Sequence, residues 1–438
     1  MSDVLEGGQR RRPPPRWVWA LVGLVVAAGV VVAAVNREGS HGSALPSPSG
    51  SPGSSPTPSI APRTESLTST APAVWPSVPG ACGWTAYLPL IAPAQRHDPV
   101  DTTVMVGGAG LQSVTADGPT AAAVRGLPEQ PGQVIGDVVA GPGGIYVGAT
   151  PCDGNAGNTA RVYKIVDGVA RPIGLTADFL LGGAHHAWRV TYPPPAASPL
   201  AGAGQPGAVL SPLDGGSSIT LETNAYPVAD TAAGLVVARS DPVNSDTPPA
   251  IELLDAATGA VVRALPDGFP LAADEHAVLL QQAAGCGFQE KVACTLERVD
   301  LATATMVRSY PLPVGRDVTS EVALSPDGNL AAFQLTRATQ DPRFNTGHPA
   351  PPSDVVVLHL DTGELDVVPH LELAPKTQAG LAFDNTSASL FITTGEGDHG
   401  ELLIWRHGMS GPAVVTTVPG PIAGAPPILV LGGASAPS

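Results

Sequence analysis

Few side chains in this sequence have types and spacings that could do chemistry. His185 and His186 are adjacent, so on a strand they face opposite sides and cannot bind one metal ion together. The stretch "TGEGDHGE" from Thr394 contains Glu396 and Asp398, carboxylates of the kind that bind hard cations, although such loops are commonly just solvated. No G-x-S-x-G, H-E-x-x-H or P-loop motif occurs. We therefore predict no catalytic residue, metal or cofactor, with Glu396 and Asp398 as the residues to examine first for a cation.

The elements that must position these residues are short strands. The chain of 438 residues has 51 glycines and 48 prolines, and it is 43% hydrophobic but 4% aromatic. Gly and Pro disfavour long helices, because Gly loses the most backbone entropy on folding and Pro lacks the amide donor. Three segments share one pattern of a β-rich run, a short turn and a second β-rich run: 251–265, 296–312 and 355–371. Each predicts a β-hairpin.

Looser copies of this hairpin extend along the chain at roughly 40 to 60 residues, the spacing of four-stranded propeller blades. The predicted turns are centred near Asp117, Asp167, Gly215, Thr258, Ala304, Thr362 and Met409. Six apolar inner hairpins alternate with them. We predict an all-β fold, a single β-propeller of seven four-stranded blades within residues 77–433. The late apolar run 426–433 is expected to pair with "TTVMVGG" of the first blade and so close the ring.

The sharpest inner hairpin is "LSPDGNLAAF", residues 324–333. Its Asp-Gly step suits a tight turn that needs a positive φ. This segment resembles the "SPDG" turn of the WD40-like (PD40) repeats in TolB-type bacterial β-propellers, and the matching residues are Ser325, Pro326, Asp327 and Gly328. The resemblance covers one repeat by motif and about residues 80–432 by architecture. It implies a propeller used for binding and brings no catalytic residue with it.

The N-terminal region predicts a membrane anchor. Residues 17–35 are uncharged and almost wholly apolar, about the length of a transmembrane helix, and four arginines precede them. We expect residues 1–16 to be a cytoplasmic basic tail and 36–76 a disordered linker rich in Ser, Pro and Thr. The propeller would then be extracytoplasmic in a single-pass membrane protein, with a disordered tail at 434–438. A cleaved signal peptide is the alternative to the anchor.

The four cysteines are Cys82, Cys152, Cys286 and Cys294, all beyond the apolar segment and so in a compartment that permits disulfides. No C-x-x-C spacing occurs, which favours structural bridges over redox or zinc chemistry. The spacing of Cys286 and Cys294 suits a hairpin staple, which would leave Cys82 for Cys152. Sequence alone allows three pairings.

The net charge excludes one class of partner, and the predicted propeller without catalytic motifs favours binding. The net charge is −16, and an acidic domain repels phosphate backbones, so nucleic-acid binding is disfavoured. We expect a protein- or ligand-binding scaffold in the bacterial cell envelope, whose partner is an envelope protein or a cell-wall component. The insertion "FNTGHPAPPSD" at 344–354 is the predicted contact surface, through Phe344, Asn345, His348 and Asp354.

The alternative is a propeller enzyme related to quinoproteins, lactonases or glycan hydrolases, with its site in the central channel. Such a site needs carboxylates or histidines at the ends of inner strands. The inner hairpins supply scattered acids, which form no recognisable set: Asp178, Asp230, Asp274, Glu275 and Glu321. An enzyme is therefore the less favoured hypothesis.

Overall fold

The computed structural model describes most of the region predicted to be a propeller. Its described residues are 77–79, 85–87, 90–91, 102–107, 111–114, 121–127, 133–151, 159–193, 207–241, 247–283, 293–318, 322–337, 353–373, 377–422 and 426–432. The predicted tail, anchor and linker, residues 1–76, lie outside them, as does the tail at 434–438. Within the described ranges, no helix is long and apolar enough to cross a membrane.

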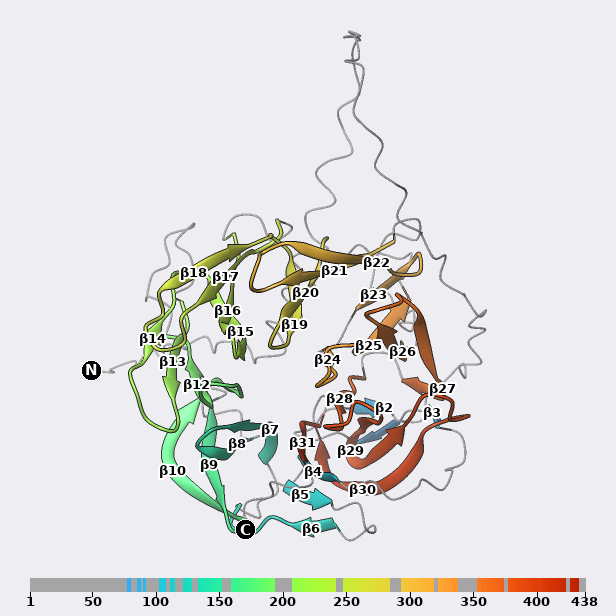
Figure 1. Cartoon of the computed structure of the whole chain (residues 1–438). Coiled ribbons are helices and arrows are strands. Elements are labelled where there is room, and N and C mark those ends of the chain that lie inside the picture. Colours follow the sequence, from blue (N-terminus) through green and yellow to red (C-terminus); the bar gives the residue numbers. More distant parts are fainter. Residues whose placement is uncertain are drawn as a thin grey trace, which may run out of the picture.

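Seven antiparallel sheets stand side by side in a ring, which is the seven-bladed propeller predicted (Figure 1). Blade 1 is β31 (Ile428–Gly432), β4 (Thr102–Gly107), β5 (Leu111–Val114) and β6 (Ala121–Ala123). Blade 2 is β7 (Gln133–Gly141), β8 (Gly144–Pro151), β9 (Ala160–Val166) and β10 (Val169–Ala177). Blade 3 is β11 (Phe179–Leu181), β12 (Trp188–Thr191), β13 (Val209–Pro212) and β14 (Ile219–Thr220).

The other blades follow in chain order. Blade 4 is β15 (Ala225–Thr231), β16 (Gly234–Arg239), β17 (Ala250–Leu254) and β18 (Val261–Leu265). Blade 5 is β19 (Phe269–Ala273), β20 (Ala277–Gln281), β21 (Thr295–Asp300) and β22 (Met306–Pro311). Blade 6 is β23 (Arg316–Val318) and β24 (Ala323–Leu324), then β25 (Leu330–Arg337), β26 (Ser353–His359) and β27 (Leu365–Leu373). Blade 7 is β28 (Gly380–Phe383), β29 (Leu390–Trp405) and β30 (Ala413–Ile422).

The ring closes as predicted. The C-terminal strand β31 pairs antiparallel with β4, with Ile428 opposite Val106 and Gly432 opposite Thr102. The Gly107 N–H adds a hydrogen bond of 2.9 Å to the Pro427 carbonyl. The last strand described thus supplies the inner strand of blade 1, so the first and last parts of the domain share one sheet, which closes the ring.

The predicted turns lie where the repeat places them. Six of the seven predicted outer turns connect the last two strands of a blade in chain order, and the seventh, near Asp117, lies outside the described residues between β5 and β6. Two of them hold non-glycine residues at positive φ, Asp167 at 52° and Ala304 at 56°, conformations that L-residues adopt at a cost. The inner turn of blade 6 has Gly328 at φ 69°, as expected for the Asp-Gly step.

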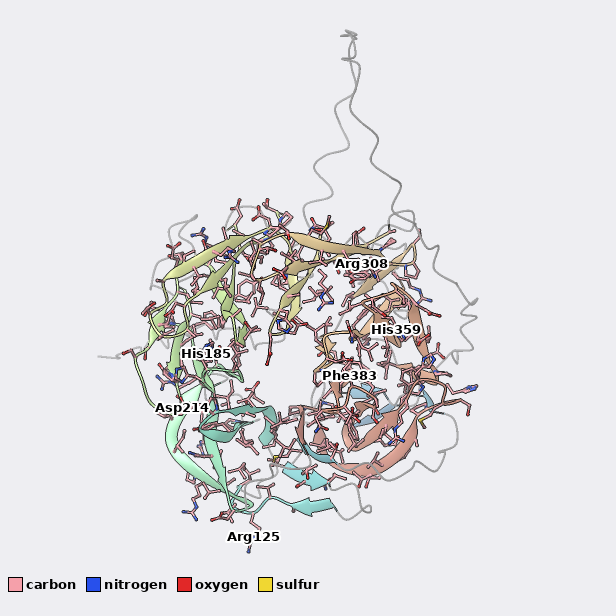
Figure 2. All side chains as sticks on the ribbon, in the orientation of Figure 1. Arg125, His185, Asp214, Arg308, His359 and Phe383 are labelled. Atoms are coloured by element: carbon pink, nitrogen blue, oxygen red, sulfur yellow. The ribbon has the colours of Figure 1, made fainter. Side chains whose placement is uncertain are left out.

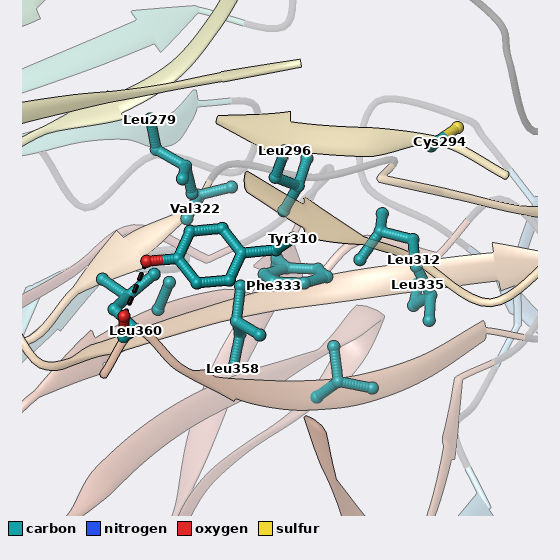
Figure 3. Close-up of a cluster of buried hydrophobic side chains, with 12 residues drawn as sticks. Leu279, Cys294, Leu296, Tyr310, Leu312, Val322, Phe333, Leu335, Leu358 and Leu360 are labelled. Carbon is teal, nitrogen blue, oxygen red and sulfur yellow. Dashed lines mark hydrogen bonds between the residues drawn. The ribbon is translucent and has the colours of Figure 1, made fainter. Parts of the chain in front are cut away.

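The core is built between neighbouring blades. One of the two largest buried clusters packs side chains of blade 5, among them Leu279, Leu296 and Tyr310, against Phe333 and Leu358 of blade 6 (Figure 3). Tyr310 donates a hydrogen bond of 2.6 Å from its hydroxyl to the Leu360 carbonyl across this seam. Strand β20 is buried at every position, because it lies between two sheets.

Two features differ from the sequence expectation. The stretch from Thr394 to Glu401 was expected to be a loop, but it belongs to β29, whose Gly397 and His399 pair with Ile422 and Pro419 of β30. The partner strand β30 extends far enough to take it into the sheet. Blade 7 accordingly shows three strands rather than four in the part of the chain described.

Three short strands precede blade 1, and the repeat pattern did not predict them. Strands β1 (Ser77–Pro79) and β2 (Thr85–Tyr87) pair with each other. Strand β3 (Leu90–Ile91) adds to the outer edge of β27, with Ile91 opposite Leu371. Blade 6 therefore gains an extra outer strand from a segment far away in the sequence.

Candidate functional site

The SPDG turn is a structural link between blades 6 and 7. Ser325 donates a hydrogen bond of 2.6 Å from Oγ to Asp327 Oδ1, and its Oγ accepts the Leu330 N–H at 2.8 Å. The Asp327 N–H donates to Ser387 Oγ at 3.1 Å, in the inner turn of blade 7. Desolvation opposes ionisation of Asp327, but hydrogen bonds from Ser325, Asn329 and Ser387 outweigh it and lower the pKa. The polar groups of the SPDG turn thus hydrogen-bond within the turn and to blade 7, which is a structural role.

Asp230 is the most fully engaged of the inner-strand carboxylates. Its side chain is completely buried on β15, yet it accepts hydrogen bonds from the backbone N–H groups of His185 and His186 at 3.1 and 2.9 Å. The indole N–H of Trp188 donates to it at 2.9 Å, and His185 Nδ1 lies 2.7 Å from its other oxygen. Asp230 therefore fastens blade 4 to the inner turn of blade 3, a structural role.

The two adjacent histidines do face different partners, as predicted. His186 Nδ1 lies 2.8 Å from Asp214 Oδ1, whereas His185 pairs with Asp230. Figure 2 shows His185 and Asp214 on the same side of the ring, across from His359. Each histidine is thus paired with a different carboxylate, and the pair does not form one chelating site.

Two of the remaining inner carboxylates hold local turns. Asp178 accepts the Tyr192 N–H at 2.7 Å, and Asp274 accepts the N–H groups of His276 and Ala277, both at 2.7 Å. Glu275 is exposed, and Glu321 lies outside the described residues. At Asp274 both N–H groups bind Oδ1, whereas Oδ2 is buried without a hydrogen bond and lies 3.6 Å from Arg298 Nη2.

Two predicted contact sites fall mostly outside the described residues. Phe344, Asn345 and His348 are among the residues not described, as are the side chains of Glu396 and Asp398. Asp354 is described, and it lies in β26 with its Oδ2 3.0 Å from Arg316 Nη1. The insertion therefore ends before Asp354, which forms an ion pair within blade 6.

The cysteine pairing stays a prediction. Cys294 is fully buried and disulfide-bonded, whereas Cys82, Cys152 and Cys286 lie outside the described residues. The Sγ atom of Cys294 lies 3.7 Å from Asp317 Oδ1.

Asp317 on β23 is the carboxylate whose pKa is most clearly perturbed. Burial raises its pKa from 3.8 to about 6, and hydrogen bonds from the Gln281 side chain and the Val318 backbone offset part of this rise. Gln281 Nε2 lies 3.3 Å from Asp317 Oδ1. Perturbed carboxylates occur at active sites and also at structural seams. The described neighbours, an amide and a disulfide sulfur, favour the structural role.

The outer edges of blades 4 and 5 carry exposed apolar side chains at matching positions. Val261 and Val262 on β18 are 58% and 55% exposed, and Met306 and Val307 on β22 are 54% and 61% exposed. Both strands end their sheets, with no further strand paired to them among the described residues. Arg263 links the two blades, because its Nη1 donates to the Leu301 carbonyl at 2.8 Å. These four residues are called the apolar edge below.

A second group combines two histidines and one carboxylate. Asp366 on β27 lies with one oxygen, Oδ2, 2.9 Å from His359 Nε2 and 2.8 Å from His407 Nδ1. The two rings meet edge to face with centroids 5.8 Å apart. His359 ends β26 and His407 lies in the outer turn of blade 7, so the group spans the seam between blades 6 and 7. Within the described residues, this is the one set of three or more such side chains close enough to share a metal ion.

Sequence reasoning missed both of these sites. Alignment of the three clearest outer hairpins places His359 at the position of Asp255 and Asp300. A search for known motifs does not detect this replacement of aspartate by histidine. No sequence pattern points to His407 as the third member, since it lies 41 residues beyond Asp366 in another blade.

Comparison with known proteins extends only to the fold. No protein-family model and no curated protein matches the chain. A protein from Lactobacillus plantarum is 11% identical over 75% of this chain and 99% of its own, with a TM-score of 0.46. Prolyl oligopeptidase B from Galerina marginata is 10% identical over 72% of this chain and 48% of its own, with a TM-score of 0.43.

A puromycin-hydrolyzing peptidase from Mycobacterium tuberculosis is 14% identical over 80% of this chain and 56% of its own, with a TM-score of 0.43. The chain spans about half the length of these two peptidases. The similarities concern the propeller fold and assign no activity. The resemblance to TolB-type propellers stays a prediction.

Proposed function

We propose that this chain is an extracytoplasmic β-propeller, anchored by residues 17–35, that binds a partner protein of the bacterial cell envelope without covalent chemistry. The observation that carries the proposal is the apolar edge. Exposed apolar side chains that recur at matching positions on neighbouring blades are a feature of interaction surfaces rather than of solvated strands.

The mode of binding that we propose is strand addition. An outer strand has an unpaired row of backbone N–H and C=O groups, which an extended segment can pair with while its side chains contact the exposed apolar residues. Blade 6 already shows this mode, because β3 adds to the outer edge of β27. The partner segment is therefore expected to be extended and apolar.

The enzyme alternative has less support. It needs inner-strand carboxylates free to act on a substrate, but Asp178 and Asp230 accept hydrogen bonds from backbone N–H groups, and Asp274 accepts two through Oδ1, which leaves its buried Oδ2 alone without a hydrogen bond. These contacts hold turns and seams of the propeller. They support a scaffold that positions surfaces.

The test is photo-crosslinking in intact cells. A photoreactive amino acid is placed at Val262 or Val307 in the tagged full-length protein. Leu175 on β10 is the matched control, because it is also an apolar residue of an outer strand and is 38% exposed. We expect one protein adduct from Val262 and Val307 and none from Leu175. Adducts from all three sites alike, or from none, would contradict the proposed surface.

A second variant separates binding from folding. The double substitution Val262→Lys and Val307→Lys adds charge to exposed positions, so the melting temperature should change little. Capture of the same partner should fall at least tenfold. If a folded double variant captures as much partner as the wild type, the apolar edge is not the binding surface, and the central channel becomes the next site to test.

A further inference from the structure

The geometry points to a binding site for a divalent transition-metal ion at the seam between blades 6 and 7, with His359, Asp366 and His407 as ligands. Two imidazoles and one carboxylate form a donor set that suits Zn²⁺ and its first-row neighbours. The ligand atoms of the three residues all lie within 4.8 Å of one another.

The two distances to Asp366 require little rearrangement. Ligand atoms bonded to one ion at about 2.1 Å lie about 3.0 to 3.4 Å apart for angles between octahedral and tetrahedral values. The two nitrogens now lie 2.9 and 2.8 Å from the same oxygen of Asp366. Each of these two contacts must lengthen by a few tenths of an ångström to admit an ion, and the two imidazole ligand atoms, which lie within 4.8 Å of each other, must come to about 3.0 to 3.4 Å apart.

The repeat shows that His359 is not needed for its turn. Blades 4 and 5 hold an aspartate at this position: Asp255 accepts the Thr258 N–H and Asp300 accepts the Thr303 N–H, each at 2.7 Å. Blade 6 forms the same backbone turn without such a cap, since the His359 N–H donates to Glu364 O at 2.8 Å. The His359 side chain is therefore available for another contact, and it lies against Asp366.

Asp366 departs from the repeat in the sign of its charge. In blade 4, Arg263 pairs with Leu253, which stands two residues before Asp255. In blade 5, Arg308 pairs with Arg298, which stands two residues before Asp300. In blade 6, Asp366 occupies the position of these arginines, because it pairs with Val357, which stands two residues before His359. An acid thus stands where the two preceding blades hold arginine.

The contact between blades changes accordingly. Arg263 donates to the Leu301 carbonyl at 2.8 Å, and Arg308 Nη1 lies 3.4 Å from the Leu360 carbonyl, so in each case arginine reaches the next blade. At the seam between blades 6 and 7, Asp366 reaches His407 instead. At the two preceding seams a positively charged arginine makes the contact, which disfavours a cation. At this seam the contact is made by two histidines and an aspartate, which are residue types that bind metal ions.

Exposure leaves room for further ligands. The side chain of His407 is 75% exposed, while those of His359 and Asp366 are 26% and 21% exposed. Three protein ligands on a surface open to solvent leave the other coordination positions to water or to a group from a partner. The alternative is a metal-free clamp in which Asp366 simply hydrogen-bonds both histidines.

The experiment is a metal titration of the full-length protein, purified with a histidine-free tag and stripped with a chelator. Zn²⁺ binding is measured by calorimetry, and Co²⁺ serves as the spectroscopic probe. We expect one saturable Zn²⁺ equivalent and a Co²⁺ visible spectrum that indicates nitrogen ligands. His359→Ala and His407→Ala should each weaken Zn²⁺ binding at least tenfold and remove the Co²⁺ spectrum.

Two histidine controls test the assignment. His186→Ala removes a histidine that also pairs with an aspartate, and His370→Ala removes an exposed histidine of β27 itself. Both should leave Zn²⁺ binding unchanged. Asp366→Asn keeps the size of the side chain and should weaken binding in a protein that melts like the wild type.

Either of two results would overturn the proposal. The first is no saturable Zn²⁺ or Co²⁺ binding by the folded wild-type chain, which would establish the metal-free clamp. The second is binding that survives in both His359→Ala and His407→Ala, which would place the ion elsewhere.

Discussion

The buried carboxyl of Asp317 gives a quantitative test of the seam between blades 5 and 6. Asp317→Asn removes the ionisable group but keeps its size and an oxygen that can accept from Gln281 Nε2, now 3.3 Å away. Burial raises the pKa of Asp317 from 3.8 to about 6, and the residue is 8% exposed. The protonated form is therefore the one that the folded state favours.

The sign follows from proton binding. Between about pH 4 and pH 6 the folded protein holds the Asp317 proton and the unfolded chain releases it, so the free energy of unfolding falls as pH rises. A gap of about two pKa units corresponds to roughly 3 kcal/mol between pH 4 and pH 7.5. Asn cannot ionise, so the variant should not lose this part of its stability. Relative to wild type, Asp317→Asn should gain roughly 3 kcal/mol over this pH range.

The assay is denaturant unfolding of both proteins at closely spaced pH values from 4 to 8. Other titrating groups affect the two proteins alike, so the difference between them isolates Asp317. A difference that does not vary with pH, or that shrinks as pH rises, would refute the assignment of a raised pKa to this buried carboxyl.

Three further predictions concern the turns, the ring and the topology. Hydrogen bonds from Thr303 lower the pKa of Asp300, so Asp300→Asn should destabilise the protein at neutral pH, with the effect lost as pH falls below about 4 in unfolding measurements extended down to about pH 2. Deletion of residues 424–438 removes β31 from blade 1 and should abolish cooperative melting in circular dichroism, whereas an unchanged melting curve would contradict ring closure. Val314→Cys, at a position that is 58% exposed and outside the apolar edge, should react with a membrane-impermeant maleimide in intact cells, and labelling only after lysis would place the propeller in the cytoplasm.

Local patterns in the sequence were enough to predict most of the fold. Alternating apolar residues and turn chemistry depend on a few neighbouring residues, so the outer hairpins and the Gly328 turn could be located from the chain alone. The fixed spacing of these hairpins then implied blades, and a ring of blades needs a closing strand, which β31 provides. Blade count and closure were therefore predictable.

The candidate sites depended on contacts between blades. The repeat pattern does not include the strands β1 to β3. Strand β3 pairs with the outer edge of β27, although no sequence pattern links the two segments. Exposure of Val262 and Val307 could be assigned only once β18 and β22 were seen to end their sheets.

The sequence by itself determined the strands, the turns and the order of the blades, because those features arise from interactions between residues close in the chain. Only the tertiary structure decided which side chains meet. His359, Asp366 and His407 come together because blades 6 and 7 pack side by side, and Asp317 has a raised pKa because blade 5 excludes water from it. Both effects depend on distance and solvent access in space, and neither is a property of residues adjacent in sequence.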